Sequence, residues 1–182
     1  MRQPWIDRCW RPDGNTTDIL DLDFTSIRAA GYLLVLLDID NTLVPHGAKM
    51  PDARSHTVVS RILSAGLACM VVSNARSARS RQFSDLLGVD CLPYAGKPSP
   101  RGVLQACRLK GMPVERTVLI GDQLFTDIAA ARRAGAAAIR VKPISKREPP
   151  HVLLKRWIER LLHQRFGLDR AFLALPVPDR SE

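Results

Sequence analysis

The sequence lacks any apolar run of the roughly 20 residues that a membrane-spanning helix needs, and no apolar run follows the charged residues at its start. We therefore expect neither a transmembrane segment nor secretion. Its four cysteines, Cys9, Cys69, Cys91 and Cys107, form no C-x-x-C pair, and no histidine stands at zinc-ligand spacing from them. This distribution disfavours a disulfide framework and a structural zinc site, and it favours a cytoplasmic location.

Two phosphate-binding signatures are also missing. The sequence contains neither G-x-G-x-x-G, which marks dinucleotide binding, nor G-x-x-x-x-G-K-[ST], which marks nucleotide hydrolysis. Lys and Arg outnumber Asp and Glu by 27 to 18, and the net charge of +9 indicates an anionic partner. Aromatic residues are only 5% of the chain and are not interleaved with the arginines, so a basic nucleic-acid-binding module is a weak alternative.

Short apolar runs alternate with helical segments along most of the chain. With 182 residues, 46% of them hydrophobic, the chain is long enough for one globular domain. About five runs have the length of buried parallel strands, at 32–37, 67–72, 90–92, 117–120 and 136–141. Helical segments at 51–64, 77–87, 100–110 and 127–134 lie between them. The alternation predicts an α/β fold, a three-layer Rossmann-like domain with a mainly parallel sheet.

The sequence also predicts how the segments outside these runs are organised. We expect residues 1–30 to pack on a catalytic core at 31–145, and residues 167–182 to form a loose tail. Residues 151–166 predict an amphipathic helix, with an apolar face formed by Leu154, Trp157, Ile158, Leu161 and Leu162. Packing of this face on the domain is the favoured interpretation, and docking on an anionic membrane is the alternative.

Two acids follow the first predicted strand directly, in the segment DIDNT, which holds Asp38, Asp40 and Thr42. In an α/β sheet, this is the edge where ligands bind. A divalent cation would explain two carboxylates placed there, because magnesium prefers hard oxygen ligands, and an aspartate beside it can attack phosphorus. A solvated Asx turn is the alternative.

Polar residues follow the later strands in the same way. Ser73 and Asn74 in VVSNA can donate hydrogen bonds to phosphate oxygens, although such a pair also caps helices. Lys97 in AGKPSP offers a positive charge, although a lone lysine is usually solvated. Asp122 and Asp127 in IGDQLFTD add two acids, for which a turn and a helix start are the alternative explanation. Each signal alone is weak, but the ordered set is specific.

The segments DIDNT, SNA, GKP and GDQLFTD resemble, in identity and order, the four motifs of the haloacid dehalogenase-like phosphatase superfamily. Within it the chain is similar to the YqeG-type branch of class IIIA, through the lead-in WRPDGNTTDILDLDFTSIRAAGYLLVLLDIDNTLV and the RRAG after GDQLFTD. The resemblance covers residues 10–145. Ala75 departs from that branch, in which a second asparagine is common at this position.

The resemblance implies a magnesium-dependent phosphomonoesterase in which Asp38 attacks phosphorus and forms an aspartyl-phosphate. Asp38, Asp122 and the backbone carbonyl of Asp40 would hold the magnesium ion. Asp40 would be the general acid and base, which requires its pKa to rise from about 3.9 toward neutrality.

The same resemblance assigns the phosphate oxygens of the substrate to Thr42, Ser73, Asn74 and Lys97. Asp127 would orient Lys97 or a metal-bound water rather than bind the ion directly.

The motif spacing leaves no room for a cap domain, because only about thirty residues separate Thr42 from Ser73. Caps in this superfamily close over small metabolites, so an open site that accepts macromolecules or surface-borne head groups is expected. Arg76 and Arg79, directly after SNA, are candidate substrate contacts, with a solvated basic helix face as the alternative.

We therefore expect a phosphomonoester substrate. The YqeG-type branch is similar to the mitochondrial phosphatidylglycerophosphate phosphatases, so the best single candidate is phosphatidylglycerophosphate, reached by peripheral contact with an anionic membrane from the cytoplasmic side. Small soluble sugar or nucleotide phosphates are the alternative substrates. A phosphate-receiving signalling domain would place similar acids in a similar fold, but the acid pairs in DIDNT and GDQLFTD favour turnover.

Overall fold

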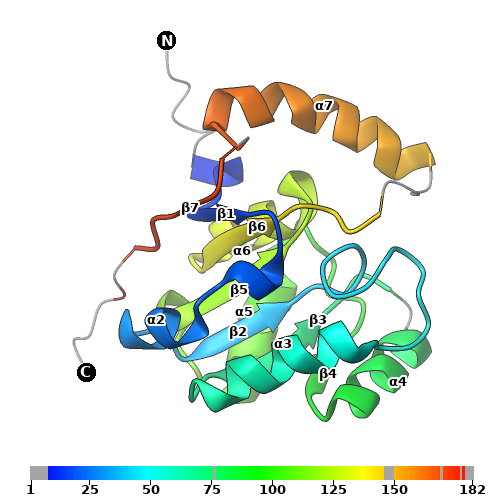
Figure 1. Cartoon of the computed structure of the whole chain (residues 1–182), viewed down its shortest axis with the longest axis vertical. Helices are drawn as coiled ribbons and strands as arrows, with labels where there is room; N and C mark the ends of the chain where they lie inside the picture. Colours follow the sequence, from blue (N-terminus) through cyan, green and yellow to red (C-terminus); the bar gives the residue numbers. More distant parts are fainter. Residues whose placement is uncertain (1–7, 76, 146–149, 169, 177, 179–182) are drawn as a thin grey trace.

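A seven-stranded sheet forms the centre of the molecule (Figure 1). The computed structural model describes residues 8–75, 77–145, 150–168, 170–176 and 178, and of 150–156 only the helix that they form. The strands are β1 (Gly14–Thr16), β2 (Leu34–Leu37), β3 (Ala68–Val72), β4 (Asp90–Leu92), β5 (Thr117–Gly121), β6 (Ala137–Val141) and β7 (Phe172–Leu173). Their order is β4-β3-β2-β5-β6-β1-β7, and every neighbouring pair except β1 and β7 is parallel.

The strands β2 to β6 confirm the five strands that the apolar runs predict. Every residue of β2 (LVLL) and of β5 (TVLIG) is buried, as expected for parallel strands covered on both faces. The sheet has two more strands than expected, because β1 pairs with β6 and β7 pairs with β1. The expectation of a loose tail is therefore wrong at Phe172–Leu173, which form the edge strand.

The helices are α2 (Phe24–Ala29), α3 (Ala53–Ser64), α4 (Ser77–Leu87), α5 (Arg101–Lys110), α6 (Ala129–Ala134) and α7 (Pro150–Phe166). Local capping explains several of their ends. The carboxylate of Asp52 accepts a hydrogen bond from the backbone N of Ser55 at 2.8 Å and starts α3. Gly111 ends α5 in the left-handed conformation, with φ of 61°. A π-helical turn, Leu124–Ile128, precedes α6 and carries Asp127.

Side chains of the strands alternate between two hydrophobic cores. From β2, Val35 and Leu37 enter the core beneath α2, α3 and α4, whereas Leu34 and Leu36 enter the core beneath α5 and α6. This gives the three layers that the sequence predicts. None of the helices that the structure describes is long and apolar enough to cross a bilayer.

The helix α7 lies across one end of the molecule, over α6 and β6 (Figure 1). Phe166 at its end is buried in the core beneath α5 and α6, and Leu162 packs against that core. Glu159 is 1% exposed, and its Oε1 accepts a hydrogen bond from the backbone N of Phe125 at 3.1 Å. The helix is therefore anchored to the π-helical turn that follows β5.

The opposite face of α7 is apolar and points to solvent. Trp157, Ile158 and Leu161 are 62%, 43% and 63% exposed. The expectation that this face packs on the domain is wrong for these three residues, because the anchoring side chains lie on the other side of the helix. Leu154, which is also predicted on this face, lies outside the described side chains.

The intervals between the motif residues contain only parts of the core. Residues 43–72 form a loop, α3 and β3, and residues 98–121 form a turn, α5, a short 3-10 turn and β5. Neither interval holds an additional domain, as the spacing predicts.

Candidate active site

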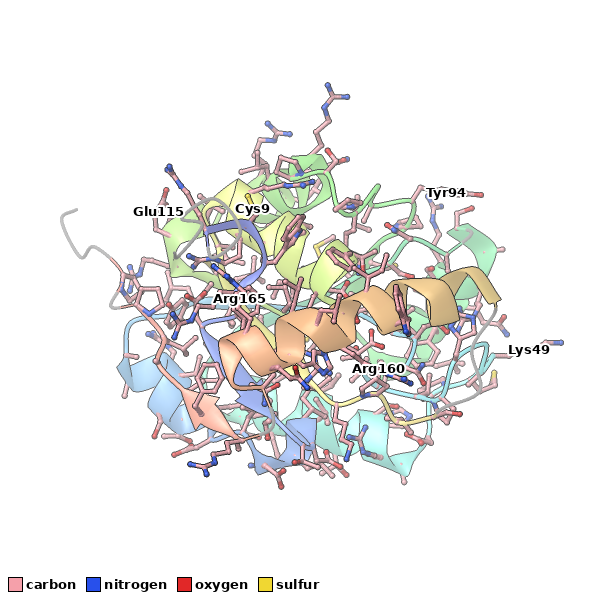
Figure 2. The ribbon with its side chains drawn as sticks, turned by 90° about the horizontal axis from the view of Figure 1, so that it is seen from above. Cys9, Lys49, Tyr94, Glu115, Arg160 and Arg165 are labelled. Carbon is pink, nitrogen blue, oxygen red and sulfur yellow. The ribbon has the colours of Figure 1, made fainter. Side chains whose placement is uncertain are left out.

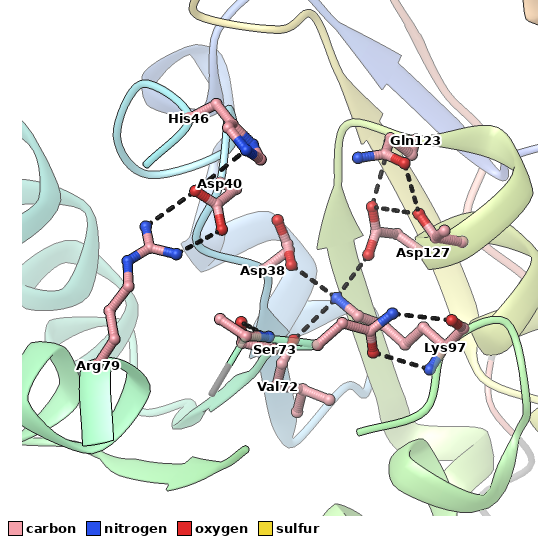
Figure 3. Close-up of polar contacts among 12 residues, drawn as sticks. Asp38, Asp40, His46, Val72, Ser73, Arg79, Lys97, Gln123 and Asp127 are labelled. Carbon is pink, nitrogen blue, oxygen red and sulfur yellow. Dashed lines mark hydrogen bonds and ion pairs between the residues drawn. The ribbon is translucent and has the colours of Figure 1, made fainter. Parts of the chain in front are cut away.

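The site lies at the carboxyl ends of three adjacent strands (Figure 3). β2 lies between β3 and β5 and is parallel to both. Asp38 follows β2, Ser73 follows β3 and Asp122 follows β5, each as the next residue of the chain. Because parallel strands end at the same edge, the structure brings these three motif residues together.

Lys97 lies at the centre of the site and is only 5% exposed. Its Nζ donates hydrogen bonds to Oδ1 of Asp38 at 2.7 Å, to Oδ1 of Asp127 at 2.6 Å and to the carbonyl oxygen of Val72 at 2.8 Å (Figure 3). All three ammonium hydrogens therefore have acceptors, which fixes the position of the charge. This burial excludes the alternative of a solvated surface lysine.

One ammonium group is shared between two buried carboxylates. Burial raises the pKa of Asp38 to about 7, although the charge of Lys97 opposes the effect and that of Asp127 adds to it. Burial would lower the pKa of Lys97, but the charges of Asp127 and Asp38 outweigh burial and raise it. Lys97 therefore stays protonated, whereas the ionised form of Asp38 is destabilised.

Asp122 completes a cluster of three buried acids. Asp38, Asp122 and Asp127 each offer one carboxylate oxygen, and these oxygens lie within 4.8 Å of one another. If all three carboxylates are ionised, the one ammonium of Lys97 leaves two negative charges uncompensated. A divalent cation would neutralise them, and carboxylate oxygens are the ligands that hard cations prefer. The donor set therefore fits such an ion.

Asp127 is held in place from a second side. Its Oδ2 accepts hydrogen bonds from the backbone N of Gln123 at 3.1 Å and from Oγ1 of Thr126 at 3.4 Å. Gly121 makes room for it, because a Cβ at that position would lie 2.4 Å from Cβ and Cγ of Asp127. Both of its oxygens therefore have partners, and one of these partners is the ammonium of Lys97.

Ser73 and Asn74 have different surroundings. Ser73 is 1% exposed, and its Oγ accepts a hydrogen bond from the backbone N of Ala75 at 3.1 Å, which leaves its hydroxyl proton to donate. The side chain of Asn74, expected at the phosphate, instead contacts the backbone of Lys97. Its Oδ1 accepts a hydrogen bond from the backbone N of Lys97 at 2.9 Å, and its Nδ2 donates one to the backbone O of Lys97 at 2.8 Å. The Thr42 hydroxyl is buried and has no hydrogen-bond partner among the described residues, so it is available to a ligand.

Asp40 differs from the expectation. Arg79 donates two hydrogen bonds to its carboxylate, each of 2.8 Å (Figure 3), and the backbone N of Gly47 donates a third, also of 2.8 Å. Nδ1 of His46 lies 3.7 Å from Oδ1. Burial would raise the pKa of Asp40, but these donors outweigh burial and hold the pKa below its usual value. The expectation of a raised pKa is wrong for this arrangement, because Arg79 pairs with Asp40.

The sequence analysis missed two residues that shape this loop. His46 faces Asp40, and Asn41 ties the loop after β2 to the segment after β6. Oδ1 of Asn41 accepts hydrogen bonds from the backbone N of His46 at 3.3 Å and of Ser145 at 3.1 Å. Its φ of 60° is a left-handed conformation that asparagine tolerates well. The asparagine in DIDNT was therefore the sequence feature that could have indicated this turn. Arg76, a candidate substrate contact, lies outside the described residues.

Comparisons with known proteins identify relatives of the chain. A family model described as HAD-hydrolase-like matches residues 94–151. The chain is 28% identical over 155 residues to the probable phosphatase YqeG of Bacillus subtilis (strain 168), covering 85% of this chain and 90% of that protein. It is 29% identical over 154 residues to phosphatidylglycerophosphate phosphatase 1, chloroplastic, of Chlamydomonas reinhardtii, covering 78% of this chain but only 56% of that protein.

A solved structure shares the fold. The cobalt-bound deoxy-D-mannose-octulosonate 8-phosphate phosphatase (YrbI) from Haemophilus influenzae superposes with a TM-score of 0.51 at 15% identity, over 76% of this chain and 91% of that chain. The likeness confirms the predicted α/β fold class, with seven strands in place of about five.

Proposed function

We propose that this chain, which belongs to the haloacid dehalogenase-like phosphatases of the YqeG type, hydrolyses phosphomonoesters through an aspartyl-phosphate on Asp38 with magnesium as its cofactor. The observation that carries the proposal is the carboxylate of Asp38, fixed 2.7 Å from the buried ammonium of Lys97 within a cluster of three acids. A carboxylate held beside fixed positive charge is suited to attack a phosphate, whose own negative charge would otherwise repel it.

The magnesium ligands proposed are Asp38, Asp122 and the backbone carbonyl of Asp40. The excess negative charge of the buried acids and their oxygen donors support this choice. When bound, magnesium would neutralise charge at the attacked phosphate and keep Asp38 ionised. Asp127 stays with Lys97, because its two oxygens already have partners.

The residues divide the chemistry between them. An oxygen of Asp38 bonds to phosphorus, the ester bond to the leaving group breaks, and Asp40 protonates the leaving oxygen. Water then bonds to phosphorus and gives a proton to Asp40, while the bond from phosphorus to Asp38 breaks. The Ser73 and Thr42 hydroxyls donate hydrogen bonds to the phosphate oxygens throughout, and the Lys97 ammonium, whose hydrogens already have acceptors, stabilises these oxygens by its charge. Asn74 acts by holding the backbone of Lys97.

We propose phosphatidylglycerophosphate as the substrate. The intervals 43–72 and 98–121 between the motif residues hold no additional domain, and a relative in Chlamydomonas reinhardtii carries this activity in its name, although the chain spans only 56% of that protein. Soluble sugar or nucleotide phosphates are the alternative substrates, and a non-catalytic nucleic-acid-binding role is the alternative from another class.

The outer face of α7 would place the protein on an anionic lipid surface. Trp157, Ile158 and Leu161 lie within one stripe of that face, and the exposed Arg160 and Arg165 flank it (Figure 2). An apolar stripe bordered by arginines inserts at the head-group level and attracts anionic lipid, and the net charge of +9 adds to the attraction. This is the peripheral contact that the lipid substrate requires.

Hydrolysis of p-nitrophenyl phosphate tests the catalytic proposal. We expect activity that needs magnesium, stops with EDTA and is absent in Asp38→Asn. Asp40→Asn should lower kcat by about a hundredfold to ten-thousandfold, because it removes the proton transfer. The exposed Asp85 on α4 provides the matched control, and Asp85→Asn should retain activity. Full activity in Asp38→Asn would refute the proposal.

A second experiment tests the substrate and the lipid surface. We expect kcat/KM for vesicle-borne phosphatidylglycerophosphate to exceed that for soluble phosphate esters and to fall as salt screens the surface. Leu161→Ser should weaken flotation with anionic vesicles, whereas Leu109→Ser, on α5 and equally exposed at 63%, should not. Preference for a soluble ester, with equal vesicle binding by both variants, would overturn the lipid proposal.

A further inference from the structure

The side chain of Arg79 pairs with Asp40 at the edge of the site and also contacts the loop after β2. The guanidinium group meets Asp40 through Nη1 and Nη2, at 2.8 Å each, and meets the carbonyl oxygen of Ala48 through Nε at 3.1 Å and Nη2 at 2.8 Å. The side chain of Arg79 is 24% exposed, so it lies at the open side of the site. Two parallel N–H groups face Asp40, in the fork geometry that also binds phosphate or carboxylate oxygens.

Asp40 cannot serve the leaving group while it is held in this way. Its oxygens accept three hydrogen bonds, from Arg79 and from the backbone N of Gly47, and all of them point to an ionised carboxylate. Asp40 stands two residues from Asp38, the residue that we propose attacks phosphorus. A partner that takes the Arg79 fork would therefore free Asp40 to reach the leaving oxygen.

We propose that Arg79 is a specificity-determining residue that binds a second anionic group on the leaving group of the substrate and releases Asp40 as it does so. The substrates selected are phosphomonoesters whose leaving group carries a phosphodiester or a carboxylate. The contact with Ala48 keeps the guanidinium in place during the exchange, because its Nε takes no part in the pairing with Asp40. The inference rests on the proposed role of Asp40 in the reaction.

Kinetics with three probes test the exchange. The probes are p-nitrophenyl phosphate, which has no second anion, 2-phosphoglycolate, which has a carboxylate, and short-chain phosphatidylglycerophosphate, which has a phosphodiester. In Arg79→Gln we expect KM for at least one of the two second-anion probes to rise about tenfold to a hundredfold, the equivalent of a lost charge-assisted hydrogen-bond pair. For p-nitrophenyl phosphate, which carries no second anion, kcat/KM should rise, because the variant frees Asp40 from the pairing. Arg79→Lys should recover part of the loss, because it restores the charge without the fork.

Controls separate this inference from the catalytic proposal. Arg81, exposed on the same helix, provides a matched variant, and Arg81→Gln should leave the ratio between probes unchanged. Urea unfolding should show that Arg79→Gln remains folded. Equal loss on all three probes, with Asp38→Asn still inactive, would overturn the role of Arg79 while the aspartyl-phosphate mechanism stands. Hydrolysis of the probes that does not depend on Asp38 would overturn both. The second-anion probe whose KM rises more in Arg79→Gln identifies the anion that Arg79 binds.

Discussion

Replacing Lys97 by methionine tests how tightly the buried charges are paired. Methionine is of similar length, so the change removes one positive charge and three hydrogen bonds, to Asp38, Asp127 and Val72. Loss of one partner from a buried ion pair leaves an uncompensated charge and costs about 3–5 kcal/mol. For a domain of this size, we expect the midpoint of thermal unfolding to fall by roughly 6–20 °C.

The measurement is urea unfolding in EDTA at neutral pH. Lys110 provides the control, because its Nζ lies 2.5 Å from Oδ2 of the exposed Asp90, and Lys110→Met should cost less than about 1 kcal/mol. Adding Asp127→Asn to Lys97→Met should recover part of the stability, since one buried charge fewer is left without a partner. If Lys97→Met costs no more than Lys110→Met, the reasoning about the buried pairs is refuted.

In EDTA, the free energy of unfolding should fall as the pH rises from about 4 to about 7, because folded Asp38 keeps a proton that the unfolded chain releases near 3.8. Saturating magnesium should flatten this pH dependence. Urea unfolding at several pH values, with and without magnesium, measures both effects. A free energy of unfolding that rises over the range in EDTA would contradict the raised pKa of Asp38. Gly121→Ala should lower kcat at least about tenfold in the p-nitrophenyl phosphate assay, because its Cβ would displace Asp127. Asn74→Ala should lower kcat roughly tenfold by releasing the backbone of Lys97, and unchanged kcat would exclude this bracing role.

Most of the sheet could be predicted because buried parallel strands leave a direct trace in the sequence. The run YLLVLL is apolar throughout, and it predicts β2 since both faces of that strand are covered. The strands β1 and β7 leave no such trace. They are three and two residues long, and they form by pairing with one another and with the edge at β6. Such pairing depends on residues far apart in the sequence, which no local pattern reveals.

In the site, the sequence indicates which residues meet but not which side chains pair. The motif order brought Asp38, Lys97 and Asp122 to one edge, because each follows a strand or precedes a helix at the carboxyl side. The partner of Asp40 could not be predicted in the same way. Arg79 lies 39 positions further along the chain, and its contact with Asp40 depends on how α4 lies against the loop after β2. The lowered pKa of Asp40 follows from that contact.

The helix α7 shows a limit of amphipathic patterns. The pattern identified a helix and an apolar face, but a pattern does not say which face meets the core. The buried Glu159 decides the orientation, because it bonds to the backbone N of Phe125 and turns Trp157 and Leu161 outward.

Detection of the phosphorylated residue tests the central claim most directly. Protein turning over p-nitrophenyl phosphate with magnesium would be quenched and treated with borohydride, which reduces an aspartyl-phosphate to homoserine, and the peptides would then be analysed by mass spectrometry. We expect homoserine at position 38 that appears only with substrate and reaches its maximum during the initial burst. Continued turnover with unmodified Asp38, or with the label at another residue, would contradict the account.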